Sequence, residues 1–215
     1  MSEGAAFSER TVDVGGPALR LVEAGQGAPV IVLAGACRFT GSPAHALLAA
    51  QRRTIVVEPE AHAEPERLGA AVAALVETMG VGRFGVIGML DAAAACCWTA
   101  VRASGVDALV LVSPRGLTAA TASGNDESGS DALLPGLAAC GVPVLVLTGT
   151  RDASLPQDTG SRLCAALPRA HAIIVYAAGA DIACDRPEAF VEVVADFLER
   201  KEQFIAARGN PVFAP

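Results

Sequence analysis

The sequence predicts an α/β protein built on a doubly wound, mostly parallel sheet of about eight strands. Short runs rich in Val, Ile and Leu alternate with Ala-rich stretches of helical periodicity along the whole 215-residue chain. Most of these runs are apolar throughout, which is typical of parallel strands that are covered on both faces. Repeated alternation of strands with helices favours a sheet that carries helices on both sides.

The first two predicted strands differ from the others because polar and apolar residues alternate in them. They are Thr11–Val14 and Leu19–Glu23, and the sequence Gly15-Gly16-Pro17 between them is typical of a hairpin turn. We therefore expect an antiparallel edge at this end of the sheet. The other predicted strands are Val30–Leu33, Thr54–Val57, Phe84–Ile87, Ala108–Val112, Val142–Leu147 and Ile173–Tyr176.

Four helices are predicted between the apolar runs. Glu66–Met79 has one apolar side and is closed by Gly80, and Ala92–Ser104 is rich in Ala and carries the only Trp. Pro156–Leu167 and Pro187–Glu202 both begin with proline, which is favoured in the first helical turn because its missing N–H has no partner there.

The sequence shows no internal repeat, and we expect residues 1–215 to form one domain. Thr118–Asp131 is rich in Gly, Ser and Asp, a composition that indicates a surface loop. The apolar tail Phe204–Pro215 is expected to pack on the domain or on a second subunit, and the latter arrangement would make the protein a homodimer.

Composition excludes several classes of function. The formal net charge is −7 and the basic residues form no cluster, so nucleic acid is not an expected partner. The apolar stretches are too short and too interrupted for a membrane span, and the first residues do not resemble a signal peptide. The six cysteines include no C-x-x-C pair, so we expect no metal site. We expect the thiols to be reduced, as in a cytoplasmic protein, and we expect no cofactor.

Catalytic groups of such sheets lie at the carboxyl ends of the strands. Four segments that end at or near these positions carry recognisable patterns. They are Pro29–Gly35, Phe84–Gly88 before a helix, PVLVLTGTRD at Pro143–Asp152, and Gly179 followed by RPEAF at Arg186–Phe190. On these segments, which come from nearly the whole chain, the sequence resembles the α/β-hydrolase superfamily. The resemblance implies a Ser–His–acid triad, whose nucleophile lies in a strained G-x-S-x-G turn after the fifth strand.

The residues at the triad positions are unusual. The small residues of the G-x-S-x-G turn match Gly88 and Ala92, which puts Leu90 at the nucleophile position. The acid of the family matches Asp152, and the His matches Ala180. With its base absent, Asp152 is also interpreted as a structural loop residue that binds its own backbone or caps the helix near Pro156. The mapped triad therefore keeps its acid but has neither nucleophile nor base, and without a nucleophile no acyl-enzyme can form.

The oxyanion loop of the family maps onto Ala34-Gly35, so backbone N–H groups of Gly35, Ala36 and Asp91 are the expected donors. These donors do not depend on side-chain identity. The lid of the family would be reduced to the short loop Gly116–Asp131, which predicts a shallow or open cleft.

Three groups are alternative candidates for catalysis. Asp91 becomes the nucleophile if the register moves by one residue, although Met89 would then occupy a position that requires a small side chain. Cys37 lies in the oxyanion loop, and Asp181 follows the vacant base position. The competing interpretations are a helix-start carboxylate for Asp91, plain burial for Cys37 and a solvated loop residue for Asp181.

The three histidines are also candidate replacements for the missing base. His171 precedes the last strand and so lies at the wrong, amino-terminal end of the sheet. His45 and His62 lack the placement of the family His, and we expect surface or capping roles for them. The sequence thus predicts a protein with a degenerate triad that binds a small molecule or a protein partner. The alternative is an active hydrolase that uses unorthodox residues on a small ester-like substrate.

Overall fold

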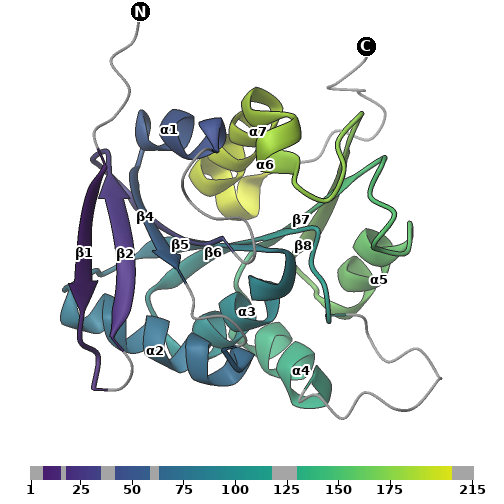
Figure 1. The fold of residues 1–215 in the computed structure, drawn as a ribbon. Helices are drawn as coiled ribbons and strands as arrows, with labels where there is room; N and C mark the ends of the chain where they lie inside the picture. The colour runs from purple at the N-terminus through teal and green to yellow at the C-terminus, as the bar shows by residue number, and fades with distance from the viewer. Residues whose placement is uncertain (1–6, 16–17, 35–41, 59–62, 118–129, 205–215) are drawn as a thin grey trace, which may run out of the picture.

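The computed structural model describes residues 7–15, 18–34, 42–58, 63–117 and 130–204, with the side chains of residues 130–132 excepted (Figure 1). These residues form one eight-stranded sheet in the order β1-β2-β4-β3-β5-β6-β7-β8. Its strands are β1 (Ser8–Val12), β2 (Leu19–Ala24), β3 (Pro29–Leu33), β4 (Arg53–Glu58), β5 (Phe84–Met89), β6 (Val106–Val112), β7 (Val144–Gly149) and β8 (Ala170–Val175).

The pairing confirms the mostly parallel sheet with an antiparallel edge. β1 pairs antiparallel with β2, and β2 pairs antiparallel with β4, whereas every other pairing is parallel. Strands β3 to β7 are almost completely buried, in agreement with their continuous apolar sequences. The carboxyl ends of β3 to β8 consequently meet at a single edge of the sheet.

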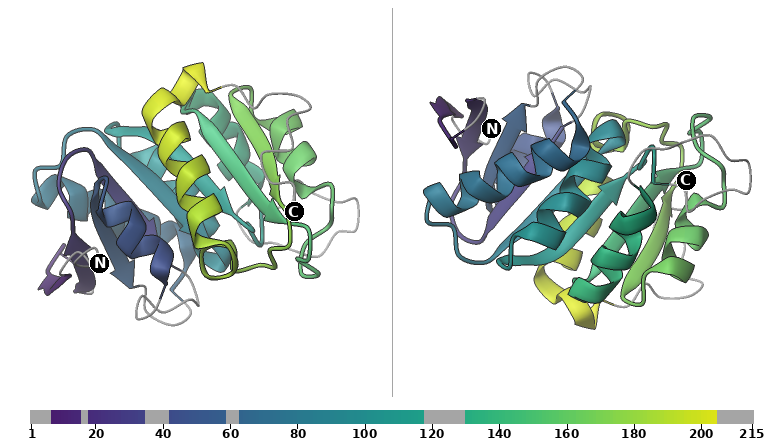
Figure 2. Two further views of the ribbon diagram at one scale, coloured as in Figure 1. Left: turned by 90° about the horizontal axis from the view of Figure 1, so that it is seen from above. Right: turned by 90° about the horizontal axis from the view of Figure 1, so that it is seen from below.

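Helices cover both faces of the sheet (Figure 2). One apolar cluster lies between the sheet and helices α2, α3, α4 and α5, and the other lies between the sheet and α1, α6 and α7. The helices are α1 (Pro43–Ala49), α2 (Pro65–Thr78), α3 (Ala93–Arg102), α4 (Ser130–Cys140), α5 (Thr159–Ala166), α6 (Ile182–Asp185) and α7 (Pro187–Arg200), with short 3₁₀ turns at Leu90–Ala92 and Lys201–Gln203.

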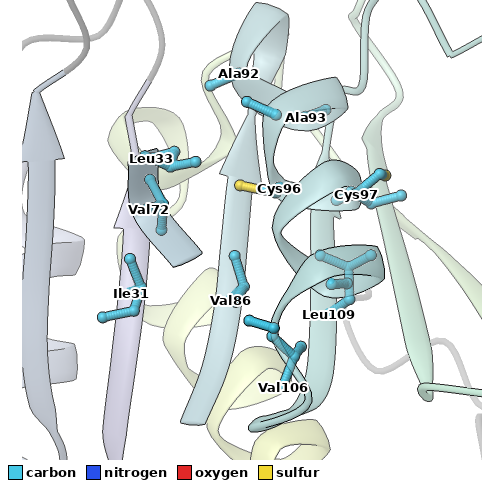
Figure 3. Packing of buried hydrophobic residues seen from close by; sticks show 14 of the residues in the cluster. Ile31, Leu33, Val72, Val86, Ala92, Ala93, Cys96, Cys97, Val106 and Leu109 are labelled. Atoms are coloured by element: carbon cyan, nitrogen blue, oxygen red, sulfur yellow. The ribbon is translucent and has the colours of Figure 1, made fainter. Parts of the chain in front are cut away.

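Helix α3 packs directly on β5 and beside α2. Its Cys96 faces the strand, and Ala92 and Ala93 lie above it at the start of the helix (Figure 3). Against α2 the contact is close enough that a Cβ on Gly69 would lie 2.5 Å from Cβ of Trp98. The Arg102 guanidinium lies 5.5 Å from the centre of the Trp98 ring and forms an ion pair with Glu66 of α2.

Several boundaries differ from the sequence prediction. The first strand is Ser8–Val12 rather than Thr11–Val14, because β1 is held by backbone pairing and by ion pairs such as Arg20–Glu9 rather than by apolar alternation. The last strand begins at Ala170 rather than Ile173, and α5 begins at Thr159 rather than Pro156. Helices α4 and α6 were not predicted.

The predicted loop 118–131 ends within α4, which begins at Ser130. The structure does not describe the rest of that loop. Also outside the described residues are Gly16 and Pro17 of the predicted hairpin turn and the tail beyond Phe204. Phe204 itself is buried, and its ring meets those of Phe197 and His171 edge-on at 5.3 and 5.6 Å between centres. No helix in the described part of the chain is long and apolar enough to span a membrane.

Candidate functional site

The turn between β5 and α3 contains a strained residue. Leu90 directly follows β5 and has φ 54°, in the left-handed region that side chains other than glycine rarely adopt. For an L-residue this conformation costs about 1–2 kcal/mol. The Leu90 side chain is buried, and its carbonyl oxygen accepts a 3.2 Å hydrogen bond from the Arg115 amide. Strain of this kind is retained only where the surrounding structure enforces it.

Gly88 explains why this turn requires small residues. A Cβ at Gly88 would lie 2.7 Å from Sγ of Cys96 and 2.9 Å from Cα of Ala93. Figure 3 shows Cys96 reaching towards β5 at this point. Burial raises the pKa of the Cys96 thiol well above its usual value and that of Cys97 to about 12, so neither thiol is a nucleophile at neutral pH.

The carboxylate of Asp152 lies in the turn after β7. Its Oδ1 accepts hydrogen bonds from the Ser154 amide at 2.9 Å and from the Ser154 hydroxyl at 2.6 Å. Burial raises the pKa of Asp152, but the Ser154 hydrogen bonds, the neighbouring Ser113 hydroxyl and the charge of Arg115 outweigh burial, and the net pKa is below its ordinary value. Asp152 is therefore ionised at neutral pH.

Two residues at the end of β6 contact this carboxylate region and had no role in the sequence prediction. Ser113 is fully buried with φ 43°, and its hydroxyl faces Asp152 without meeting hydrogen-bond geometry. Arg115 donates from Nη2 to Oγ of Ser154 at 3.4 Å, and its Nη1 lies 3.8 Å from Oδ2 of Asp91. The only sequence signal for them was their position directly after an apolar strand.

These residues form a polar cluster of Asp91, Ser113, Arg115, Asp152 and Ser154. Three of its buried atoms have no hydrogen-bond partner among the described residues: Ser113 Oγ, Arg115 Nε and Asp152 Oδ2. Buried polar atoms are normally satisfied, and an exception in a native structure marks a strained or functional place. The cluster lies beside Leu90, because the Arg115 amide donates to the Leu90 carbonyl.

The loop after β8 contacts the end of β7, which brings Ala180 to the same edge as Asp152. The Arg151 amide donates to the Ala178 carbonyl at 2.8 Å. A Cβ on Gly149 would lie 2.2 and 2.3 Å from the carbonyl oxygens of Ala178 and Gly179, so only glycine allows this approach. The half-buried Ala180 has no ionisable group to contribute there.

Asp181 begins α6, where its Oδ1 accepts a 3.2 Å hydrogen bond from the Cys184 amide. It is half-buried, so the sequence interpretation as a solvated loop residue is only partly right: the side chain has a capping role. Asp91 is exposed in the first 3₁₀ turn. Gly35, Ala36 and Cys37, the expected oxyanion loop and its thiol, lie outside the described residues.

His45 corrects the sequence prediction of a surface or capping role. It lies in the first turn of α1 and only 2% of it is exposed. Burial lowers the pKa of His45 to about 4, against an opposing contribution from the Asp181 charge, so the imidazole is neutral at pH 7. His171 is half-buried on β8, away from this edge, and His62 lies outside the described residues.

Groups of ligating side chains that could hold a metal ion are absent from the described part of the chain. Two cavities lined by described residues lie elsewhere. One runs between α1 and α7, and the other lies between α4 and the residues around Leu167. What the carboxyl edge contains is therefore a strained apolar turn beside an ionised carboxylate and an arginine.

Comparison with solved structures identifies this architecture as the α/β-hydrolase fold. A serine hydrolase involved in carbazole degradation superposes with TM-score 0.72 at 20% identity, covering 91% of this chain and 100% of that one. The 2-hydroxy-6-oxo-6-phenylhexa-2,4-dienoate hydrolase of Rhodococcus sp. strain RHA1 gives TM-score 0.73 at 14% identity, with 91% and 99% covered. Carboxylesterase CesB of Bacillus subtilis gives 0.70 at 15% identity, with 90% and 92% covered.

No family model and no curated protein matches the sequence. At these identities the likeness concerns the fold and not the activity. The expected α/β-hydrolase fold is thus confirmed, whereas the chemistry of this chain has to be argued from its own residues.

Proposed function

We propose that this α/β-hydrolase-fold protein acts by binding a small molecule or a protein partner and does not catalyse hydrolysis. The observation that carries the proposal is Leu90, an apolar side chain in the one strained turn between β5 and α3. In the hydrolase family this turn holds the nucleophile. A strained backbone conformation that carries no reactive group is what a hydrolase ancestry with a lost nucleophile would leave behind.

The left-handed residue supports the register with Leu90, and not Asp91, at the nucleophile position. The positive φ belongs to Leu90, and the tight contact of Gly88 with α3 lies two residues before it. In the shifted register, Met89 would have to occupy the small position and Asp91 the strained one. Asp91 is instead exposed, 3.8 Å from an arginine that holds it as an ion-pair partner.

The missing base is the second argument. Asp152 is ionised, but Ala180 offers no imidazole for it to orient, and general base catalysis contributes typically 10²–10⁴-fold. The charge of Asp181 acts on His45, but this imidazole is buried, and a base with a pKa of about 4 is weak at neutral pH. We therefore favour the non-catalytic function over the alternative of an active hydrolase.

Hydrolysis of p-nitrophenyl acetate by the purified protein tests the proposal. The wild type, Asp152→Asn and Asp91→Asn should show equal rates, and so should Asp158→Asn, a control at an exposed carboxylate in the N-cap position of α5. A serine-directed fluorophosphonate should not label the chain. A wild-type rate that falls selectively in the Asp152 or Asp91 variant would establish catalysis and overturn the proposal.

Binding is tested separately by thermal denaturation with a panel of short-chain carboxylic acids and their methyl esters. A ligand that binds only the folded state stabilises it by RT ln(1 + [L]/Kd), so Tm rises with ligand concentration. Loss of that shift in Arg115→Ala, but not in Arg162→Ala on α5, would place the ligand at the polar cluster. If no compound shifts Tm, the small-molecule form of the proposal is wrong and the protein-partner form is left.

A further inference from the structure

An open groove lies between α1 and α7, on the side of the sheet that these helices share. Its volume is about 640 Å³. The apolar part of its lining consists of Leu47 of α1 and Val191 and Ala195 of α7. Leu47 is 38% exposed and is one of three large apolar residues, with Ile174 and Tyr176, that are exposed in the described part of the chain. The groove is separate from the polar cluster described above.

The same side of α7 carries a row of acidic residues. Glu188, Glu192, Asp196 and Glu199 line the groove together with Val191 and Ala195, at the spacings that place residues on one side of a helix. Their row covers eleven residue steps, which is about 16 Å or three turns. A row of carboxylates therefore runs along α7 beside a short apolar patch of Leu47 and Ala195, whereas Val191 is only 4% exposed.

Only part of this negative charge is compensated. Arg52 pairs with Glu199 at 3.1 Å, and Arg200 pairs with Asp196 at 2.6 Å. Glu188 and Glu192 are exposed and make no ion pair with another described residue. The groove thus keeps two uncompensated carboxylates beside exposed apolar surface, in a chain whose net charge is −7.

We propose that this groove binds a basic amphipathic helix of a partner protein. An amphipathic helix binds a groove of this kind by placing its apolar side chains on the apolar part of the groove, here Leu47 and Ala195, while its polar flank follows the three-turn row of carboxylates. Lysine or arginine residues on the flank of that helix would meet Glu188 and Glu192, and complementary charge of this kind sets orientation and association rate. The negative surface disfavours a second copy of this acidic chain and an anionic membrane.

The groove is open along its length, and this also decides against a small molecule. Sites for small molecules are concave and cover most of the ligand surface. The inference does not depend on whether the carboxyl edge is catalytic, so the two proposals can fail independently.

The probe is a fluorescein-labelled synthetic peptide of about four helical turns, with leucines on one side and lysines on the other. Its binding to the full-length protein is measured by fluorescence anisotropy at about 0.15 M salt, where weak long-range attraction is screened. Leu47→Ser and Glu192→Lys should each raise the Kd of the peptide about tenfold, which corresponds to about 1.4 kcal/mol of binding free energy.

Two matched variants control for general effects. Ile174→Ser changes another exposed apolar residue, on β8, and Glu77→Lys makes the same charge change at an exposed position on α2. Both should change the peptide affinity by less than about twofold. Because all four positions are at the surface, circular dichroism and Tm of the variants should stay close to the wild type.

Three outcomes would overturn the inference. The first is that the wild type does not bind the peptide. The second is that Glu77→Lys weakens binding as much as Glu192→Lys, which would mean non-specific attraction. The third is that sedimentation shows a dimer that Leu47→Ser dissociates, which would make a second copy the occupant. Loss of binding confined to the Leu47 and Glu192 variants supports it.

Discussion

Gly88 of β5 and Cys96 of α3 approach so closely that a Cβ at position 88 would lie 2.7 Å from the Cys96 sulfur. This contact fixes the distance between the strand and the helix that follows it. The strained turn at Leu90 lies directly between these two residues along the chain. The geometry of the turn is thus imposed by packing beneath it and does not depend on any reactive group.

The Gly88 contact predicts that Gly88→Ala destabilises the fold by about 1–3 kcal/mol, because the new methyl group must displace α3 or Cys96. Gly82→Ala is the control, since a Cβ there meets nothing within 4 Å and its backbone is not left-handed. Urea denaturation followed by circular dichroism measures both. Equal midpoints for the two variants would contradict the close packing.

Strain at Leu90 predicts an inverted order of stability for two substitutions. Leu90→Gly should be more stable than Leu90→Ala by about 1 kcal/mol, because glycine adopts a left-handed φ without a Cβ clash. At the buried Leu68 of helix α2 the order should be the usual one, with the Ala variant about 1 kcal/mol more stable. An identical order at both positions would mean that Leu90 is not strained.

Reintroducing the two missing groups tests the mapping of the triad. Leu90→Ser with Ala180→His should hydrolyse p-nitrophenyl acetate about 10²-fold faster than either single variant, since a nucleophile and its base act only together. Adding Asp152→Asn should remove most of the gain because the imidazole loses its orienting carboxylate. A double variant that is no faster than its parents would show that these three positions do not converge.

The buried imidazole of His45 predicts a pH dependence of stability. Its pKa is about 4 when folded and about 6.5 when unfolded, so the unfolded chain binds the extra proton between these values. The free energy of unfolding should therefore be unaffected by this group above pH 6.5 and fall by up to about 3 kcal/mol as pH falls from 6.5 to 4.

Urea unfolding at a series of pH values measures this fall. His45→Gln should reduce the slope between pH 4 and 6.5 relative to the wild type. If the free energy of unfolding falls with the same slope in the wild type and in His45→Gln, another titrating group causes the pH dependence.

The sheet was predictable because burial on both faces leaves a direct mark on the sequence. Each central parallel strand is a continuous apolar run, as in Val30–Leu33, and this pattern needs no knowledge of the neighbouring strand. The edge strand β1 carries no such mark, since Glu9 and Arg10 are held by ion pairs to β2, and its predicted position was wrong by three residues.

The short helices and the polar cluster were beyond sequence reasoning for a different reason. Helix α1 has seven residues, too few to show which side is buried, and the burial of His45 was missed for that reason. Ser113 and Asp152 approach each other only because β6 and β7 are neighbours in the sheet. Residues that meet across strands leave no pattern in either segment alone.

The contact of α2 with α3 provides the chain with a built-in optical reporter. Trp98 is the only tryptophan, and it lies where Gly69 and the Arg102 guanidinium approach it. Its emission therefore responds to separation of these two helices, whereas circular dichroism reports on the molecule as a whole. Recorded together in the same denaturation experiment, the two signals would distinguish detachment of α2 from unfolding of the sheet.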